Sequence, residues 1–551
     1  MIFFALNCFA WLEPRLGERV FGKVENLGVR LAERKKESIL VLMLLVPLVR
    51  LPLLTVMPAP VPAVPDEFSY LLTADTFVHG RLTNPPHPMR EYFETIHVNQ
   101  LPKYMSKYPP AQGAVLAIGQ ILGHPWIGVV ISVSIMCGSI LWMLQGWMPA
   151  RWALLGAILA FLRLGIFSYW INSYWGGAVP AIGGALVIGA LPRILKHQNT
   201  RDALLLGIGV AILANSRPFE GLILCLPVAG FLMTWLLRRT SPVCHITLPR
   251  VCVPIFVVLL LTGVFLCFYN WKGTGSPFLF PYQVNERTYM STPPFFWQKL
   301  KPPLSYTNPV LDATYNQWAR SFWSANRFAF LKRAAKLVYF FLWPELCILV
   351  VTLPAVIRDR RTRLLLIQFS VSFVGLLVVV WCQPHYAAPI ICVIYALLVQ
   401  AMRHLRRWTI NNREVGIGLT RAIVVFSAVM CLTWAGVAAR NPRSGTLVAS
   451  AGVWGVPGNW ARAEILVRLE SIPGEHLVIV RSSDELRYGE WVSNGADLEH
   501  GKVIWARETP GKSLQPLVNY YSSRRVWRVE WDHSSPQLVP YIQTRINKET
   551  Y

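Results

Sequence analysis

Two adjacent carboxylates, Asp66 and Glu67, follow Pro65 shortly after the first strongly apolar run of the sequence. Burial and neighbouring charges tune the pKa of a carboxylate, so such a group serves as a general base or as a metal ligand. Acidic residues after a proline also suit the first turn of a helix, where they meet the positive end of the helix dipole. The spacing alone leaves both interpretations of this pair open.

A second polar group, Lys107 and Tyr108, stands before two prolines and the apolar stretch 109–123. This stretch is too short to cross a bilayer comfortably, and prolines start helices well, so we expect a helix lying in the membrane interface. A lysine at the start of such a helix is placed to hold a phosphate. The alternative is a lysine that reaches lipid phosphate without a specific role.

Several other ionisable residues fall at or near the ends of apolar runs. Arg217 and Glu220 occupy a very short turn between two such runs, where charges are costly unless they pair with each other or serve a function. Arg163 lies inside a third run, and its guanidinium is a candidate for facing a phosphate. His385 follows another run, and a lone histidine of this kind is more often structural than functional.

The segment 271–333 is rich in aromatic residues and proline, and it includes Tyr282. It is too long for a simple connection, and functional loops of this length commonly close over a substrate. Aromatic rings stack on sugar faces, which makes Tyr282 a candidate contact residue. The alternative is an amphipathic segment whose rings lie in the membrane interface.

The composition places these residues in a membrane protein. Of the 551 residues, 54% are hydrophobic and 15% are charged, and several runs approach the roughly 20 apolar residues that cross a bilayer. The net charge of +24 comes from short basic clusters between apolar runs, which is typical of cytoplasmic anchors facing anionic lipid and argues against a nucleic-acid partner. The ten cysteines show no disulfide framework and no zinc-site spacing.

The apolar runs predict a polytopic α-helical membrane protein with eleven spans. Arginine and lysine gather in one set of short loops, whereas the short loops of the other set hold only Arg217, so the positive-inside rule places the N-terminus in the cytoplasm and the C-terminus outside. The predicted spans are about 38–57, 125–146, 150–168, 176–196, 202–215, 219–237, 249–270, 334–356, 364–382, 384–402 and 419–439.

This topology divides the chain into three regions. Residues 1–37 form a cytoplasmic segment that reads as a surface helix, and 38–439 form the transmembrane module with outer loops 58–124 and 271–333. The tail, 440–551, follows a linker over 442–458. Its pattern predicts helices at 459–470 and 513–522 and strands at 476–481, 502–507 and 525–531, which indicates a small extracytoplasmic α/β domain.

The chain resembles the GT-C superfamily of integral-membrane glycosyltransferases, which includes protein O-mannosyltransferases and the lipid A aminoarabinose transferase. The resemblance is carried by Asp66-Glu67 in the first outer loop, by Lys107-Tyr108-Pro109-Pro110 and by the many-span layout, over roughly residues 38–400. Bacterial members of the superfamily have segments that look like 215–221, 384–389 and parts of the tail.

The resemblance implies a GT-C-like fold in the bacterial inner membrane and an inverting transfer on its outer face. The donor would be a polyprenyl-phosphate sugar, and the acceptor a hydroxyl of a lipid, glycan or protein. Asp66 matches the catalytic aspartate of the family, with Glu67 beside it, and Lys107 matches its phosphate-contacting lysine. The other predicted substrate-binding residues are Tyr108, Arg163, Arg217, Glu220, His385 and Tyr282.

Two departures from the family pattern bear on the chemistry. Tyr108 separates the lysine from the prolines, whereas the family lysine usually precedes them directly. Many members also carry a second acidic residue in the next outer loop, but here that loop, 168–177, has none and offers only Asn172 as a neutral oxygen ligand. Dependence on a divalent metal such as Mg²⁺ or Mn²⁺ therefore stays open.

The sequence supports two further functional hypotheses. A transporter or flippase of a lipid-linked saccharide would line its path with the same charges, although the chain shows no internal repeat of the kind found in many transporters. A scaffold subunit of a cell-envelope complex would keep the fold without the chemistry.

Overall fold

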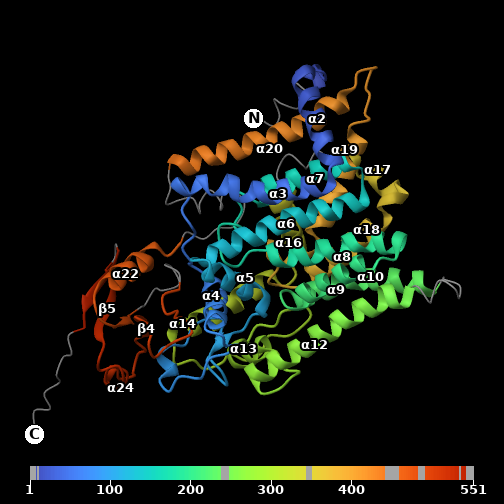
Figure 1. The fold of residues 1–551 in the computed structure, drawn as a ribbon. Helices are drawn as coiled ribbons and strands as arrows, with labels where there is room; N and C mark the ends of the chain where they lie inside the picture. Colours follow the sequence, from blue (N-terminus) through green and yellow to red (C-terminus); the bar gives the residue numbers. More distant parts are fainter. Residues whose placement is uncertain are drawn as a thin grey trace, which may run out of the picture.

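A computed structural model describes residues 8, 11–237, 247–342, 350–440, 458–481, 490–532 and 535–541. These residues are mostly helical, with a small mixed β-sheet region near the C-terminus (Figure 1). Most of the linker expected over 442–458 lies outside the described residues, as does 343–349 of the expected span 334–356.

Seven helices among the described residues are long and apolar enough to cross a membrane, so the chain is an integral multi-pass membrane protein. Each of the seven coincides with a span expected from the sequence. They are Lys35–Thr55 (α3, Lys35–Arg50, with the 3-10 turn Pro52–Thr55), Pro125–Trp147 (α6), Ala178–His197 (α8), Pro218–Leu237 (α10), Leu248–Thr274 (ending in α12, Val253–Thr274), Pro384–Leu405 (ending in α19, Ile391–Leu405) and Val415–Arg440 (α20).

The other four expected spans contain shorter helices, namely α7 (Ala150–Leu164), α9 (Thr200–Ala214), α16 (Phe330–Leu342) and α18 (Arg363–Leu377). The other described α-helices before the tail are α2 (Glu18–Glu33), α4 (Pro65–Val78), α5 (Pro110–Ile121), α13 (Pro281–Tyr289), α14 (Pro309–Leu311), α15 (Ala319–Asn326) and α17 (Leu353–Arg358). The stretch 109–123 is thus helical, as expected.

α6 lies at the centre of the bundle and packs against α3, α5, α7, α8 and α19. Its buried side chains, Val133, Met136, Ile140 and Leu144 among them, are fully enclosed. They recur every three or four residues, the spacing of one helix face. Close packing at the crossing with α5 depends on Gly119 and Gly128, because a Cβ on either would lie within 2.3 Å of the backbone of the other helix.

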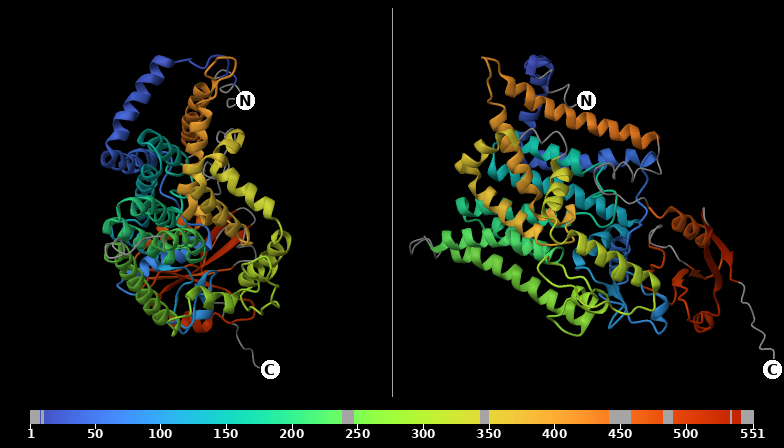
Figure 2. Two further views of the ribbon diagram at one scale, coloured as in Figure 1. Left: turned by 90° about the vertical axis from the view of Figure 1, so that its right-hand side faces the viewer. Right: turned by 180° about the vertical axis from the view of Figure 1, so that it is seen from behind.

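The segments expected outside the membrane gather at one end of the bundle. α4, α13, α14 and the β-sheet region lie together there, while α17 and the turn between α19 and α20 lie at the opposite end (Figures 1 and 2). Asp66, Lys107 and the long aromatic segment are therefore on a common side, which is the arrangement that the alternating topology predicted.

The tail contains α22 (Trp460–Ser471), α24 (Gln515–Tyr520) and a four-stranded sheet of order β4-β3-β5-β6. β3 (His476–Val480) pairs in parallel with β4 (Val503–Arg507) and β5 (Arg525–Asp532), and β6 (Ser535–Pro540) pairs antiparallel with β5. Five of these elements match sequence expectations, whereas β6 was not expected. The sequence run of β6 contains two prolines, which a sheet tolerates at an edge strand.

The two faces of β3 are buried against different partners. Val478 and Val480 face α22, where they meet Leu469. Leu477 and Ile479 face the other way and join a core with residues of α4 and the first outer loop, namely Leu72, Tyr92, Phe93, Val98 and Tyr104. Successive strand residues point to opposite faces, so this alternation is what a strand covered on both sides requires. The tail and the first outer loop thus share one hydrophobic core.

Candidate active site

Asp66 and Glu67 occupy the first turn of α4, directly after Pro65. The Glu67 carboxylate accepts hydrogen bonds from the backbone N–H groups of Ala63 (2.9 Å), Val64 (3.2 Å) and Tyr174 (3.1 Å). Burial raises the pKa of Glu67 to about 7, and these hydrogen bonds act in the opposite direction. Glu67 therefore fixes the start of α4 and ties it to the next outer loop.

The Asp66 carboxylate points away from this network and is partly exposed. The phenolic hydroxyl of Tyr108 donates a short hydrogen bond to its Oδ1 atom. The Nε2 atom of His97 lies 3.8 Å from its Oδ2 atom. Asp66 is thus partly exposed and bonded to a side chain, whereas Glu67 is buried and bonded to backbone N–H groups.

A short hairpin positions His97 next to Lys107. β1 (Val98–Asn99) pairs with β2 (Met105–Ser106), and the N–H of Lys107 donates to the carbonyl of His97 (3.2 Å) at the next position of the ladder. The hydroxyl of Ser69 in α4 also donates to that carbonyl (2.7 Å). The hairpin is thereby anchored to the helix that carries Asp66.

The charge of His97 follows from its surroundings. Burial, with a smaller contribution from the Lys107 cation, lowers the pKa of His97 to about 3, and the attraction of Asp66 opposes this change only in part. The imidazole is therefore neutral at pH 7. Asp66 thus faces a neutral imidazole on this side, 3.8 Å away, rather than an imidazolium.

The Lys107 side chain is buried, with 5% of its surface exposed. Its ammonium lies over the rings of Tyr108 (5.2 Å) and Tyr282 (5.6 Å), and the described residues include no hydrogen-bond or ion-pair partner for it. Burial lowers its pKa to about 8, against the attraction of Asp66 and Glu286. A buried ammonium held by aromatic rings alone is well suited to receive an anion.

Arg217 adds a second cation on this side. Its guanidinium lies 4.2 Å from the ring centroid of Tyr386, and its charge contributes to the lowered pKa of Lys107. The turn that holds Arg217 is tied to the start of α5 by a hydrogen bond from the N–H of Ala111 to the carbonyl of Asn215 (2.9 Å). This contact joins the segments that carry the two cations.

The predicted residues Glu220 and His385 both lie near Tyr386. Glu220, in the first turn of α10, lines a small cavity together with Tyr386 and Leu376. His385 is buried against Trp175, and its Nδ1 atom lies 2.9 Å from the hydroxyl of Tyr169. His385 therefore packs beside Tyr386 and is held there by Trp175 and Tyr169.

The structure does not bring Arg163 into this group. Its guanidinium donates to the backbone carbonyls of Phe340 (2.7 Å) and Tyr339 (3.3 Å) near the end of α16. A second cation near the outer end of the bundle, Arg50, is likewise engaged, because it donates to Oδ1 of Asn172 (3.0 Å). The oxygen of Asn172 is thus already bound to a guanidinium.

Three residues in or beside the group were not predicted from the sequence. His97 reaches Asp66 through the hairpin, and the ring of Tyr70 stacks on that of Tyr108 at 4.5 Å. Tyr315, from the long aromatic segment, is buried near the backbone of His97. Burial raises the pKa of Tyr315, and the charge of Asp66 adds to this. The aromatic composition of 271–333 was the one sequence signal for Tyr315.

The donor set around Asp66 does not fit a divalent metal ion. Mg²⁺ and Mn²⁺ require several oxygen ligands, usually including more than one carboxylate. The described residues contain no group of three His, Cys, Asp or Glu side chains that could hold a metal, and the groups nearest Asp66 are a phenol, a neutral imidazole and a buried ammonium. We therefore assign no step to a metal.

The helices define an integral multi-pass membrane protein with a small mixed β-sheet region. The chain is similar to the crystal structure of ArnT from Cupriavidus metallidurans bound to undecaprenyl phosphate, with 15% identity and a TM-score of 0.49 over 89% of this chain and 92% of that one. It is also similar to the oligosaccharyltransferase of Archaeoglobus fulgidus in complex with Zn and sulfate (14%, TM-score 0.44, 89% of this chain and 68% of that one).

The archaeal oligosaccharyltransferase AglB from Archaeoglobus fulgidus, in complex with an inhibitory peptide and a dolichol-phosphate, gives 13% identity and a TM-score of 0.37 over 90% of this chain and 69% of that one. The structural similarity expected from the sequence is found over about nine-tenths of this chain, at 13–15% identity. No family model and no curated protein sequence matches the chain. Because the likenesses have TM-scores below 0.5, a function for this chain has to follow from its own side chains.

Proposed function

We propose that this chain is a membrane glycosyltransferase that moves a sugar from a polyprenyl-phosphate donor to an acceptor hydroxyl, with Asp66 as the general base. The observation that supports this most directly is that Tyr108 contacts both groups. Its hydroxyl bonds the partly exposed Asp66 carboxylate, and its ring lies under the buried Lys107 ammonium, which has no ion-pair partner among the described residues. Transfer from a phosphate ester needs a base for the acceptor and a cation for the leaving group.

In the proposed reaction the acceptor oxygen attacks the anomeric carbon while Asp66 takes the proton of the acceptor hydroxyl. The bond from the anomeric carbon to the phosphate oxygen breaks, and its electron pair leaves with the polyprenyl phosphate. Lys107 and Arg217 offset the charge that develops on that phosphate. Attack opposite to the leaving group inverts the configuration of the sugar. Tyr108 orients Asp66, and Tyr282 lies beside the ammonium where the sugar phosphate would bind.

We further propose that the chain crosses the bacterial inner membrane eleven times, with residues 1–37 in the cytoplasm and 440–551 outside. The four shorter helices α7, α9, α16 and α18 would complete the set of spans. This topology puts Asp66 and Lys107 at the outer surface, where the carrier lipid keeps its chain in the bilayer and its phosphate at headgroup height. Undecaprenyl phosphate is one member of this class of carrier. The acceptor belongs to lipid, glycan or protein.

The test uses purified wild-type protein and Asp66→Asn in lipid nanodiscs. Each is incubated with a panel of polyprenyl-phosphate sugars, and release of free polyprenyl phosphate is measured. We expect the wild type to release it and Asp66→Asn to lose at least about a hundredfold in rate, with unchanged thermal unfolding and donor binding.

Equal turnover by a folded Asp66→Asn variant would remove Asp66 from the chemistry. Movement of the saccharide lipid across the bilayer without bond cleavage would instead identify a transporter.

A further inference from the structure

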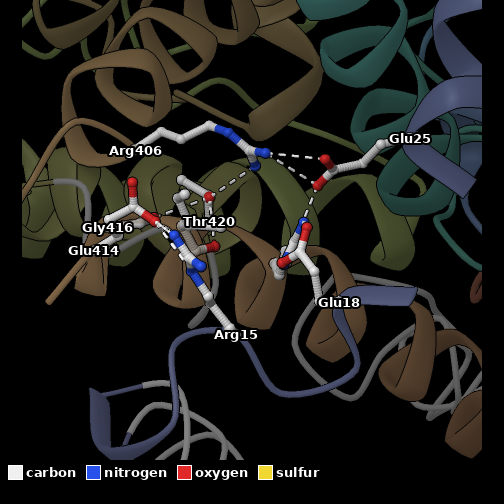
Figure 3. A network of polar contacts seen from close by, with 9 residues as sticks. Arg15, Glu18, Glu25, Arg406, Glu414, Gly416 and Thr420 are labelled. Atoms are coloured by element: carbon white, nitrogen blue, oxygen red, sulfur yellow. Dashed lines mark hydrogen bonds and ion pairs between the residues drawn. The ribbon is translucent and has the colours of Figure 1, made fainter. Parts of the chain in front are cut away.

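The N-terminal helix α2 carries three distinct faces. Its acidic face holds Glu18 and Glu25, which pair with arginines of the helical bundle. Arg421 contacts Glu18 at 2.6 Å and Glu25 at 3.0 Å. Arg406 contacts Glu25 at 3.0 Å (Figure 3). Just before α2, Arg15 pairs with Glu414 (2.9 Å). These contacts fix how α2 is rotated about its own axis.

A second face of α2 is apolar and uncovered. Val20, Val24 and Leu27 are 66%, 62% and 69% exposed, and they follow one another at helical spacing. Leu16, one turn earlier, is exposed as well. A stripe of this kind is unfavourable in water and marks a surface that meets an apolar partner.

A third face of α2 is basic and borders the apolar stripe. Arg19, Lys23 and Arg30 are exposed, and their spacing puts them on one side of the helix, roughly opposite Glu18 and Glu25. An exposed basic run, Arg34–Lys36, continues at the junction with α3. An apolar stripe flanked by Lys and Arg is the pattern of helices that lie in an anionic membrane surface.

The position of α2 in the fold brings this pattern to the bilayer. α2 leads directly into α3, a candidate membrane span, and lies crosswise to α3 and α20 (Figures 1 and 2). The exposed Leu40, Leu44 and Leu48 of α3 have to face lipid if α3 crosses the membrane. α2 therefore ends at the membrane surface and runs along it.

We propose that α2 is an interfacial helix that binds anionic phospholipids, with Val20, Val24 and Leu27 in the acyl region and Arg19, Lys23 and Arg30 on the headgroup phosphates. The ion pairs to Arg406 and Arg421 engage Glu18 and Glu25, so the remaining exposed charges of α2, three cations and Glu33, are mostly basic. This proposal does not depend on the chemistry at Asp66.

The test measures hydrogen–deuterium exchange of residues 18–33 in the full-length protein, in nanodiscs of phosphatidylcholine alone or mixed with phosphatidylglycerol. We expect exchange to slow about tenfold or more with phosphatidylglycerol, since each basic residue near an anionic surface contributes about a factor of five. The difference shrinks as salt is raised.

Two variants and one control separate the parts of the proposal. Arg19→Gln/Lys23→Gln/Arg30→Gln and Val20→Ser/Val24→Ser/Leu27→Ser should each lose the protection. Arg201→Gln/Arg358→Gln/Arg360→Gln removes the same charge from exposed sites outside α2 and should keep it.

Equal exchange in the two lipid compositions, or equal loss in the control, would overturn the proposal. Slow exchange of residues 18–33 that depends on two protein copies per nanodisc, and not on phosphatidylglycerol, would also overturn it. The apolar face of α2 would then bind a second copy of the chain.

Discussion

The hydroxyl of Tyr108 donates a hydrogen bond to Oδ1 of Asp66, and the ammonium of the preceding residue, Lys107, lies over the Tyr108 ring. A single dipeptide thus contacts the proposed base and carries the proposed phosphate ligand. The residue that separates the lysine from the prolines is the residue that orients Asp66.

Tyr108→Phe removes this hydrogen bond and keeps the ring that supports Lys107. We expect kcat to fall about tenfold, because a carboxylate with more rotational freedom is less often aligned with the acceptor, while KM for the donor stays within about twofold. Steady-state rates of polyprenyl phosphate release test this. The control is Tyr520→Phe, which removes a hydroxyl bonded to Glu499 in the tail. A change in donor KM without a change in kcat would argue against the orienting role.

The loss of the Lys107 charge at high pH should weaken the reaction with the donor. Because burial lowers its pKa to about 8, the cation is present below this pH and is lost as the pH rises through it. We expect kcat/KM for the donor to fall above about pH 8, since this ratio reports the free enzyme. Lys107→Arg should stay flat over the same range because a guanidinium remains charged. A wild-type profile that is flat beyond about pH 9 would contradict this account.

Glu67→Gln should act on stability rather than on chemistry. An amide cannot accept all three backbone N–H bonds, so we expect a loss of about 1–3 kcal/mol. Folding raises the pKa of Glu67 to about 7 from 4.5, so its stabilising contribution is full below pH 4.5 and declines as the pH rises to about 7. Thermal unfolding across this range should therefore show a pH dependence in the wild type that Glu67→Gln lacks.

Substitutions of Arg217 and Arg163 should have different effects, the first on donor binding and the second on stability. Arg217→Gln is expected to raise the donor KM by about tenfold or more, because a charged contact to phosphate is lost. Arg163→Gln should lower the thermal stability and leave the donor KM within about twofold, since Arg163 holds carbonyls of α16. Donor titrations of both variants decide this, and the reverse pattern would make Arg163 the phosphate ligand.

Chelation tests the donor set around Asp66. One carboxylate beside a phenol, a neutral imidazole and an ammonium does not form a site for a hard cation, so we expect the rate of polyprenyl phosphate release to be unchanged by EDTA. A loss of activity in EDTA that Mg²⁺ or Mn²⁺ restores would show that a metal is bound by other groups.

The sequence predicted what depends on periodicity and charge. Seven candidate spans agree with the expected positions, and β3, β4, β5, α22 and α24 lie where the alternation of the tail put them. The common side of Asp66 and Lys107 followed from their place in one expected outer loop, 58–124. These features are local, so one stretch of chain carries each signal.

The details of the site depend on contacts between distant segments and were not predictable. His97 is brought to Asp66 by the register of a hairpin whose strands have two residues each, too short to show any alternation. Arg163 was a candidate for facing a phosphate. Its guanidinium instead donates to a carbonyl of the neighbouring helix α16, and a contact of this kind between distant segments leaves no local signal in the sequence. The different surroundings of Asp66 and Glu67 also depend on a distant residue, Tyr174.

The hydrophobic core that joins the tail to the first outer loop imposes an order on biosynthesis. About 400 residues separate Leu72 from Leu477. At typical rates of synthesis, β3 is therefore made about 20–80 s after α4. Until then the helix that carries Asp66 has one apolar side open. A chain that stops before residue 476 would lack β3, so α4 acquires this cover only when nearly all of the chain has been made.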